Sequence, residues 1–161
     1  MRTMHDMPKP TIPHREVVQS YYLSPSRTLY ITEEETSFPD GCLITSHTDL
    51  DGIIKHANNS FVQMSGWTRE EIIGQPHEIL RHPDMPRAAF AGLWETVKSG
   101  KRWTGYVKNL RKDGGFYWVF ATIVPSYRNG QVVGYTSVRR KPARSKVEEM
   151  QTLYAQMRNA E

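Results

Sequence analysis

The strongest periodic pattern of apolar residues lies between residues 86 and 98. Apolar side chains recur there at positions i, i+3, i+4 and i+7, and charged side chains take the opposite side. This spacing predicts a helix with one broad apolar stripe that faces a core. A glycine at position 100 follows the pattern, as is common just after a helix. The stripe consists of Phe90, Leu93, Trp94 and Val97.

Alternation of apolar and polar residues predicts five strands in the main part of the chain. The three longest are separated by Asp113-Gly114 and Asn129-Gly130, residue pairs that supply the positive φ angles of tight hairpin turns. The expected strands cover residues 42–46, 53–56, 103–110, 116–126 and 131–139.

Two short helices are expected between the second and third of these strands. Asn58-Asn59-Ser60 offers N-cap residues for the first, and Thr68 with Glu71 forms a capping-box pattern at the start of the second. Helices of one or two turns do not persist in water alone, so both require a tertiary surface.

The faces of the long strands indicate how the sheet is covered. Trp103 and Asn109 share one face of the first long strand, and an amide at the end of an apolar face is a candidate ligand contact. The strand from Phe116 is apolar on both faces as far as Val124, so both faces must be covered. The helices supply one cover, and we expect the N-terminal arm or a second subunit to supply the other.

The two ends of the chain are expected to lie outside the main domain. Residues 1–38 are expected to form an N-terminal extension or cap, with a disordered start followed by either a short helix over 13–23 or a loosely ordered arm. The main domain is expected at 39–141. Residues 142–161 carry a helical pattern, which is either an ordinary terminal helix or a connecting helix that signals to a partner.

Composition limits the class of protein. A chain of 161 residues suits one domain with extensions, and no apolar run approaches the roughly 20 residues that span a bilayer. A single cysteine, Cys42, excludes an internal disulfide framework. The net charge of +4 is scattered along the chain. The basic patches, such as Arg139-Arg140-Lys141, are all short, which argues against nucleic-acid binding. We expect a cytoplasmic protein without membrane insertion.

A polar cluster precedes the predicted long helix. Asp84 suits a helix N-cap, but a cap requires neither Arg81 nor His82. A guanidinium and an imidazole at a helix start suit a phosphate group or the polar edge of a heterocycle. The cluster is therefore a candidate ligand site.

The ordered series of motifs resembles the FAD-binding PAS domain of bacterial aerotaxis receptors. The resemblance covers about residues 40–140 and implies an α+β fold, a five-stranded antiparallel sheet in the order 2-1-5-4-3 with the helices on one face. The motifs that carry it are His56-Ala57-Asn58, Phe61-Val62-Gln63, Gly74-Gln75-Pro76-His77, Arg81-His82-Pro83-Asp84-Met85-Pro86, Trp103-Thr104-Gly105, Lys108-Asn109 and Tyr117-Trp118-Val119.

The resemblance further implies a non-covalent FAD whose ring lies between the helices and the sheet and whose redox form reports oxygen or electron transport. Trp103 and Phe90 suit the faces of the ring, and Asn109 suits its polar edge. Trp94, which shares the stripe of Phe90, is a further candidate. The implied cofactor residues are Asn58, Arg81, His82, Asp84, Phe90, Trp103, Asn109 and Tyr117.

The resemblance also implies partners and leaves alternatives. Aerotaxis receptors continue into a HAMP module and a chemotaxis signalling domain, so we expect such a partner, a homodimer, and either an excised sensor or a stand-alone protein. A PAS domain that binds haem through His77 or His82, or another small ligand, is one alternative. A cofactor-free dimerisation module is another. No catalytic motif was found, so an enzyme is not expected, and Cys42 lies too early for a flavin adduct.

Overall fold

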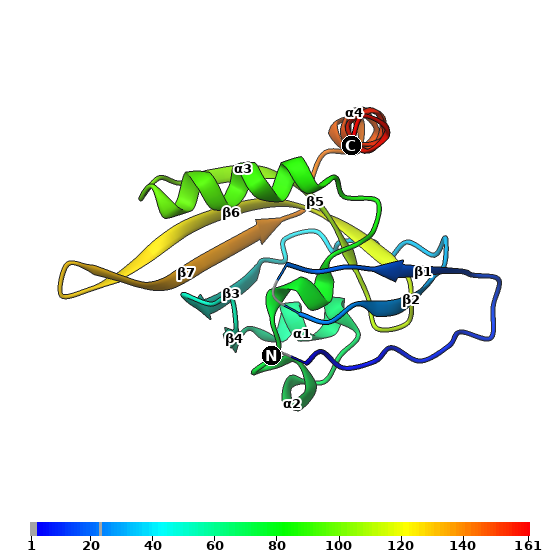
Figure 1. The fold of residues 1–161 in the computed structure, drawn as a ribbon, viewed down its shortest axis with the longest axis horizontal. Helices are drawn as coiled ribbons and strands as arrows, with labels where there is room; N and C mark the ends of the chain where they lie inside the picture. Colours follow the sequence, from blue (N-terminus) through cyan, green and yellow to red (C-terminus); the bar gives the residue numbers. More distant parts are fainter. Residues whose placement is uncertain (1–2, 23) are drawn as a thin grey trace.

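The computed structural model describes residues 3–22 and 24–161. Within them the chain forms a five-stranded antiparallel sheet, a separate two-stranded hairpin and several helices (Figure 1). The large sheet has the order β4-β3-β7-β6-β5, which confirms the expected 2-1-5-4-3 arrangement of an α+β fold. Its strands are β3 (Ile44–Asp49), β4 (Ile54–Ala57), β5 (Trp103–Leu110), β6 (Phe116–Arg128) and β7 (Gln131–Arg140).

The helices that precede β5 cover one face of this sheet, here called the inner face, which includes Tyr117, Val119 and Ala121 of β6. The first helices begin at the predicted caps: the Asn58 side chain accepts from the Phe61 backbone N–H, and Thr68 forms a complete capping box. The inner-face helices are α1 (Asn59–Ser65), α2 (Arg69–Ile72), the 3₁₀ helix η1 (His77–Leu80) and α3 (Arg87–Lys98).

The N-terminal segment forms a strand rather than the helix predicted over 13–23. Strand β1 (Arg15–Gln19) pairs with β2 (Arg27–Ile31), and Leu23 lies outside the described residues. The helical interpretation placed Val17 and Val18 on one face, but Val18 is 71% exposed whereas Val17 packs beside Leu29. The side chains therefore alternate as in a strand, which suits two consecutive β-branched residues.

The hairpin packs against the main domain and is not a loosely ordered arm. Leu29 and Ile31 are buried together with Leu110 at the end of β5. The turn between β5 and β6 approaches β2 so closely that a Cβ at Gly114 would lie 2.2 Å from the carbonyl oxygen of Tyr30. Gly114 also has a φ of +88°, so both the turn and the approach require glycine.

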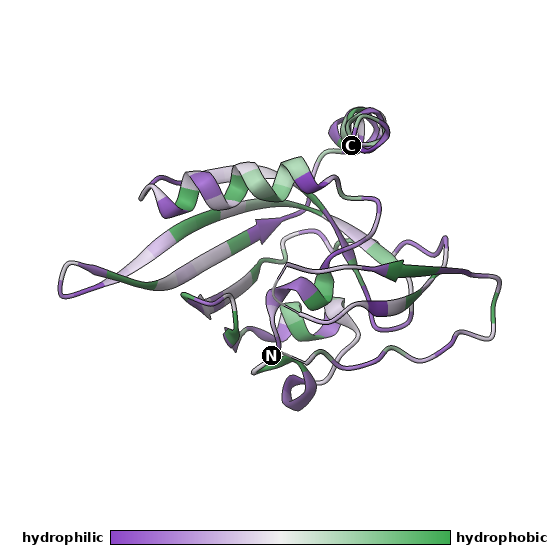
Figure 2. Cartoon of the chain, in the orientation of Figure 1, coloured by the Kyte–Doolittle hydropathy of each residue, from purple (hydrophilic) through white to green (hydrophobic). Residues whose placement is uncertain are grey.

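The outer face of the sheet is covered by the C-terminal helix α4 (Arg144–Asn159), which we had not expected. Val147 and Tyr154 pack against Phe116 and Trp118 of β6, and the Tyr154 hydroxyl donates to the Tyr106 carbonyl at 2.6 Å. In the ribbon coloured by hydropathy, β6 carries several apolar stretches along its length (Figure 2). The doubly apolar strand is thus covered within one chain over this part of its length.

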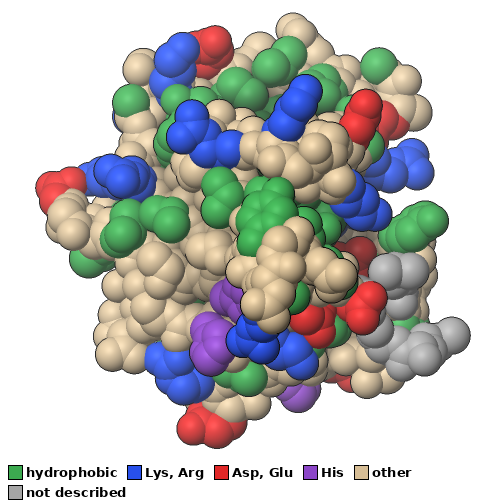
Figure 3. Space-filling model, turned by 90° about the vertical axis from the view of Figure 1, so that its left-hand side faces the viewer, with side chains coloured by type: hydrophobic (Ala, Val, Ile, Leu, Met, Phe, Trp, Pro, Cys, Tyr) green, Lys and Arg blue, Asp and Glu red, His purple; other side chains and the backbone are tan. Residues whose placement is uncertain are grey.

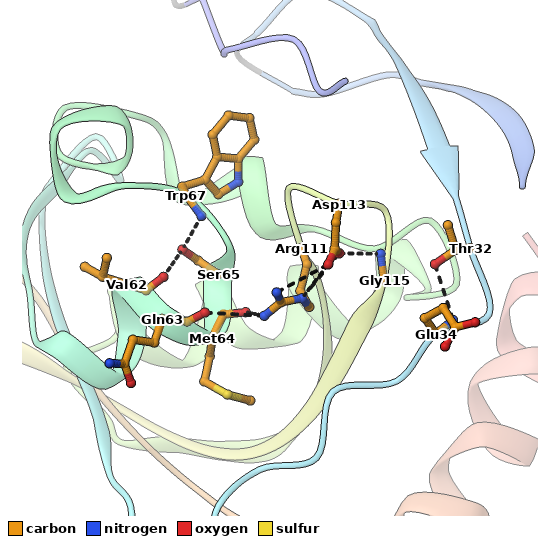
Figure 4. A network of polar contacts seen from close by, with 10 residues as sticks. All are labelled: Thr32, Glu34, Val62, Gln63, Met64, Ser65, Trp67, Arg111, Asp113 and Gly115. Carbon is orange, nitrogen blue, oxygen red and sulfur yellow. Dashed lines mark hydrogen bonds and ion pairs between the residues drawn. The ribbon is translucent and has the colours of Figure 1, made fainter. Parts of the chain in front are cut away.

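Arg111 fastens the end of α1 to the β5–β6 turn (Figure 4). Its guanidinium donates to the carbonyl oxygens of Gln63 and Met64 and to the Asp113 carboxylate. The Asp113 side chain in turn accepts from the Gly115 backbone N–H at 2.9 Å. These contacts satisfy carbonyl groups at a helix end, which otherwise lack partners.

Candidate functional site

Two neighbouring strands present unpaired polar groups to the interior. Asn109 of β5 and Tyr117 of β6 are direct cross-strand partners on the inner face. Both are buried, and neither the Asn109 Nδ2 nor the Tyr117 hydroxyl makes a hydrogen bond of good geometry in the described part of the chain, although the Asn109 amide lies close enough to Tyr117 to lower its pKa against the larger effect of burial. Burial raises the pKa of Tyr117 to about 12, so its hydroxyl stays protonated and is available as a donor.

A second pair of unpaired groups lies on β7. Arg139 is 3% exposed, and its Nη2 donates to the Ser46 hydroxyl at 2.9 Å and to the His77 Nε2 at 2.6 Å. Its Nη1 and the Ser137 hydroxyl have no partner among the described residues. Burial lowers the pKa of Arg139 to about 10, so the side chain remains charged at neutral pH.

His77 is held in one neutral form by this arrangement. A guanidinium can only donate, so the His77 Nε2 is the acceptor and the ring proton lies on Nδ1. Burial, followed by the nearby Arg139 charge, lowers the pKa of His77 to about 3.

These orphaned groups fit a ligand with a polar edge. Leaving a buried donor or acceptor unpaired costs about 1–3 kcal/mol, so four such groups on one sheet face require an explanation. An amide, a phenol, a hydroxyl and a guanidinium can together meet the carbonyl and ring-nitrogen edge of a flavin. The residues present on this face therefore fit the cofactor that the sequence implies.

The aromatic candidates lie at three different places on the inner side. The Trp103 ring lies flat over its own strand, so close to Gly105 that a Cβ at this glycine would lie 2.5 Å from the ring. The Trp94 ring packs against Tyr135 with centroids 5.5 Å apart, as part of the core under α3. The Phe90 ring lies 4.8 Å from the Arg81 guanidinium, a cation–π contact.

Asn58 is occupied by structural contacts. Its Oδ1 accepts from the backbone N–H groups of Phe61 and Thr45, at 3.0 and 3.2 Å, and its Nδ2 donates to the Leu43 carbonyl at 2.8 Å. These bonds join β3 to the start of α1, so the structure gives this side chain a scaffold role.

The segment before α3 runs along the edge of β5. The backbone of Arg81 forms an antiparallel bridge with Asn109, which places the predicted polar cluster beside the inner-face pair. His82 is 1% exposed, and its Nδ1 accepts from the Asp84 backbone N–H at 3.0 Å. Because burial lowers the pKa of His82 to about 3, the ring is neutral and its proton lies on Nε2, which has no acceptor in the described residues.

Asp84 does not cap the long helix as we had expected. Pro86 occupies the N-cap position of α3 without a side-chain hydrogen bond. The Asp84 carboxylate instead accepts from Lys108 Nζ at 2.8 Å and from Arg15 at 3.0 Å. The backbone carbonyl of Asp84 accepts from Arg158 of α4. Burial opposes ionisation, but the hydrogen bond from Lys108 and the nearby positive charges of Lys108 and Arg15 together outweigh it and lower the pKa of Asp84 to about 2.

The structure thus separates the predicted residues into two groups. Asn109, Tyr117 and Trp103 lie on the inner face, whereas Arg81, His82 and Asp84 line the edge of β5. Sequence reasoning missed Ser137 and Arg139, since Arg139 was considered only as part of the short basic patch Arg139-Arg140-Lys141. Alternation along β7 was the available signal, because it places an arginine on the face of buried Tyr135.

An open pocket of about 500 Å³ lies elsewhere, beside β3, β4 and α2. Its wall includes His47, His56, Lys55 and Arg69. The space-filling view shows a face on which histidine side chains lie beside lysine and arginine side chains, below a group of hydrophobic ones (Figure 3). No group of three or more His, Cys, Asp or Glu side chains among the described residues is arranged to hold a metal ion.

Comparison with known proteins assigns the fold to a family. A PAS fold model matches residues 54–139, which is more than half of the chain, and the chain belongs to this family. It is 47% identical over 125 residues to the aerotaxis receptor of Escherichia coli (strain K12), a match that covers 78% of this chain and 25% of the receptor. The chain therefore spans about a quarter of the length of that relative.

Solved structures show the same fold. The PAS domain of a protein from Colwellia psychrerythraea is 31% identical, with a TM-score of 0.53 over 62% of this chain and 86% of that chain. A light-oxygen-voltage domain studied with a flavin analogue is similar in fold, with a TM-score of 0.60 at 23% identity over 68% of this chain and 83% of that chain. Within the described residues, no helix is long and apolar enough to span a membrane.

Proposed function

We propose that this PAS domain binds FAD non-covalently and senses redox or oxygen state through it. The observation that carries the proposal is the set of buried, unpaired polar groups on the inner face, namely Asn109, Tyr117, Ser137 and Arg139. The 47% identity to an aerotaxis receptor supports the same function. When bound, FAD supplies a reversible redox centre whose ring nitrogens gain or lose protons with the electrons.

The two groups of predicted residues take different parts in this proposal. Asn109 and Tyr117 hold the polar edge of the ring, with Trp103 and Phe90 toward its faces and Trp94 behind them. Arg81 lies beside Asn109 and binds the anionic or polar part of the cofactor, outside the ring system. His82 and Asp84 position this segment, and Asn58 fixes the start of α1.

The His82 tautomer favours a flavin over haem. Haem ligation requires an unprotonated ring nitrogen directed at the iron, but the free Nε2 of His82 carries the proton because Nδ1 accepts from Asp84. The Nε2 of His77 is already occupied by Arg139. Both histidines would have to leave their present contacts to bind iron.

We further propose a division of labour along the chain. Residues 39–141 form the sensor, residues 1–38 form an extension that covers its edge, and residues 142–161 form a helix that connects the sensor to a partner. The partner is a chemotaxis-type signalling domain or a HAMP-like module, and the working unit is a cytoplasmic homodimer. The contact of α4 with β6 gives this helix a direct connection to the sheet.

A redox cycle in solution tests the function. The purified protein is reduced with dithionite under nitrogen and then exposed to air, while absorption and hydrogen exchange are recorded in both states. We expect the flavin bands to bleach and return, and we expect exchange in α4 to differ between the states. If the flavin bleaches and returns but hydrogen exchange in α4 stays the same, the protein binds the cofactor but does not signal through α4.

A further inference from the structure

The indole of Trp103 covers the inner face at the start of β5. Its six-membered ring lies so close to Gly105 that a Cβ at this glycine would be 2.5 Å from both Cη2 and Cζ2. The three heavy atoms nearest to that position all belong to Trp103. The glycine is therefore what allows the indole to lie flat on the strand.

The backbone at Gly105 does not itself require glycine. Its φ lies outside the left-handed region, unlike that of Gly114 in the following turn. Glycine inside a strand is usually unfavourable, because it has no side chain to pack, and it often marks the close approach of another group. The approach of Trp103 is the observation that accounts for glycine at this position.

A ring held at Asn109 lies along β5 in the direction of Gly105. Beyond Asn109 the inner side is closed by the end of α1, where the Lys112 backbone N–H donates to the Ser65 carbonyl at 2.9 Å. At about 3.4 Å per residue, Gly105 is roughly 14 Å from Asn109, which is the reach of an amide, its hydrogen bond and three fused rings. The indole and such a ring therefore cover the same part of the sheet.

We propose that Trp103 is a mobile plug of the ring site. The indole closes the site by lying on Gly105, and the isoalloxazine ring binds only after the indole has rotated off the glycine. This inference rests on the proposed function, because it names the flavin ring as the group that displaces Trp103. The displaced indole then stands at a face of the ring, which is the part that Trp103 takes in that proposal.

The position of Trp103 permits this movement. Trp103 is the first residue of the edge strand β5 and is only half-buried. Its side chain is held by packing against the apolar clusters under α1 and α3. If opening costs about one aromatic contact, the open form is the minor one and the apparent affinity for flavin is lowered by roughly threefold to tenfold.

Gly105→Ala tests the plug, because its methyl group holds the indole off the strand without removing it. In stopped-flow mixing of the apoprotein with FAD, we expect faster association and an apparent affinity higher by roughly threefold to tenfold. The same substitution is then made in Trp103→Ala, where no indole remains to be displaced. Any contact of the methyl group with the flavin is common to both backgrounds and cancels in the ratio of the two effects. Equal effects in the two backgrounds would contradict the plug.

Gly92→Ala is the matched control. Gly92 lies in α3, its φ is outside the left-handed region, and nothing lies within 4 Å of an added Cβ. Alanine there should raise the melting temperature, because glycine weakens a helix interior, and should leave flavin association unchanged. An equal acceleration in Gly92→Ala would assign the effect to stability rather than to Trp103.

The NMR signals of Gly105 follow the plug in the parent protein. An aromatic ring stacked over a glycine moves its Hα signals upfield, so we expect an upfield shift in the apoprotein that disappears when FAD binds. A parent protein that binds no FAD overturns this inference together with the proposed function. A parent protein that binds FAD while the Gly105 Hα signals keep their upfield shift overturns the plug alone and leaves the proposed function standing.

Discussion

The Lys108 ammonium and the Asp84 carboxylate lie 2.8 Å apart where the edge strand β5 meets the segment that leads into α3. The same carboxylate accepts from Arg15 of the N-terminal hairpin, and the backbone carbonyl of Asp84 accepts from Arg158 of α4. One residue beside the proposed site therefore contacts both ends of the chain. A change in the position of this segment has a direct route to the hairpin and to the C-terminal helix.

Asp84→Asn should destabilise the fold, because it leaves the buried Lys108 ammonium without its counterion. The Lys108 side chain is only 6% exposed, so we expect a loss of about 1–3 kcal/mol in the free energy of unfolding. Urea denaturation of the apoprotein measures it. Asp40→Asn is the control, since the Asp40 side chain is 91% exposed and its pairing with Lys141 should not affect the midpoint.

Stability should fall as the pH decreases from about 6.5 toward 3, because of the two buried histidines. His77 and His82 have folded-state pKa values lowered to about 3, against 6.5 when unfolded. Between these values the unfolded chain binds more protons, so each histidine contributes a slope of up to about 1.4 kcal/mol per pH unit. Thermal melts of the parent and of His82→Gln, recorded across this range, should show a smaller slope in the variant. Equal slopes would mean that His82 is not held neutral by burial.

The C-terminal helix should depend on Tyr154. The Tyr154 hydroxyl donates to the Tyr106 carbonyl, and its ring stacks on Trp118 with centroids 6.2 Å apart. Tyr154→Phe keeps the ring and loses the hydrogen bond, so we expect a loss of about 0.5–1.5 kcal/mol. Faster hydrogen exchange confined to α4 would agree with this account, and unaltered exchange there would contradict it.

Asn109 is the expected contact that reads the redox form of the ring. Reduction converts a ring nitrogen from acceptor to donor, and an amide can present either of its ends. A coupling of about 1–3 kcal/mol corresponds to a shift of roughly 20–60 mV in the midpoint potential. Asn109→Leu should shift the potential by this amount, as measured by titration against reference dyes. The parent potential in a flavin-loaded variant would exclude Asn109 as the switch.

Local patterns predicted most of the fold because their signals do not depend on distant residues. The Asn129-Gly130 turn and the Thr68 capping box are both present. The N-terminal hairpin was missed because Val17 and Val18 fit either a helix face or a strand, and only contact with Leu29 decides between them. The sequence also did not reveal that α4 covers Trp118, since amphipathicity indicates an apolar face but not its partner.

The candidate site was predicted less completely than the fold. Strand alternation and the resemblance both indicated Asn109, and the resemblance added Tyr117, which the structure brings beside it. Asn58, which the resemblance implied as a cofactor residue, serves as the helix cap that the N-cap pattern had indicated. Arg139 was considered only as part of a short basic patch, because neighbouring basic residues look alike in sequence. Its burial depends on the register of β7 against β3 and β6, which a single sequence does not specify.

The central claim is that this domain holds FAD, and the chromophore of the purified protein tests it most directly. The account predicts a yellow protein with a two-banded flavin spectrum that releases FAD, about one per chain, on denaturation. A Soret band with released haem would contradict the account. So would a colourless protein that takes up no FAD when it is added.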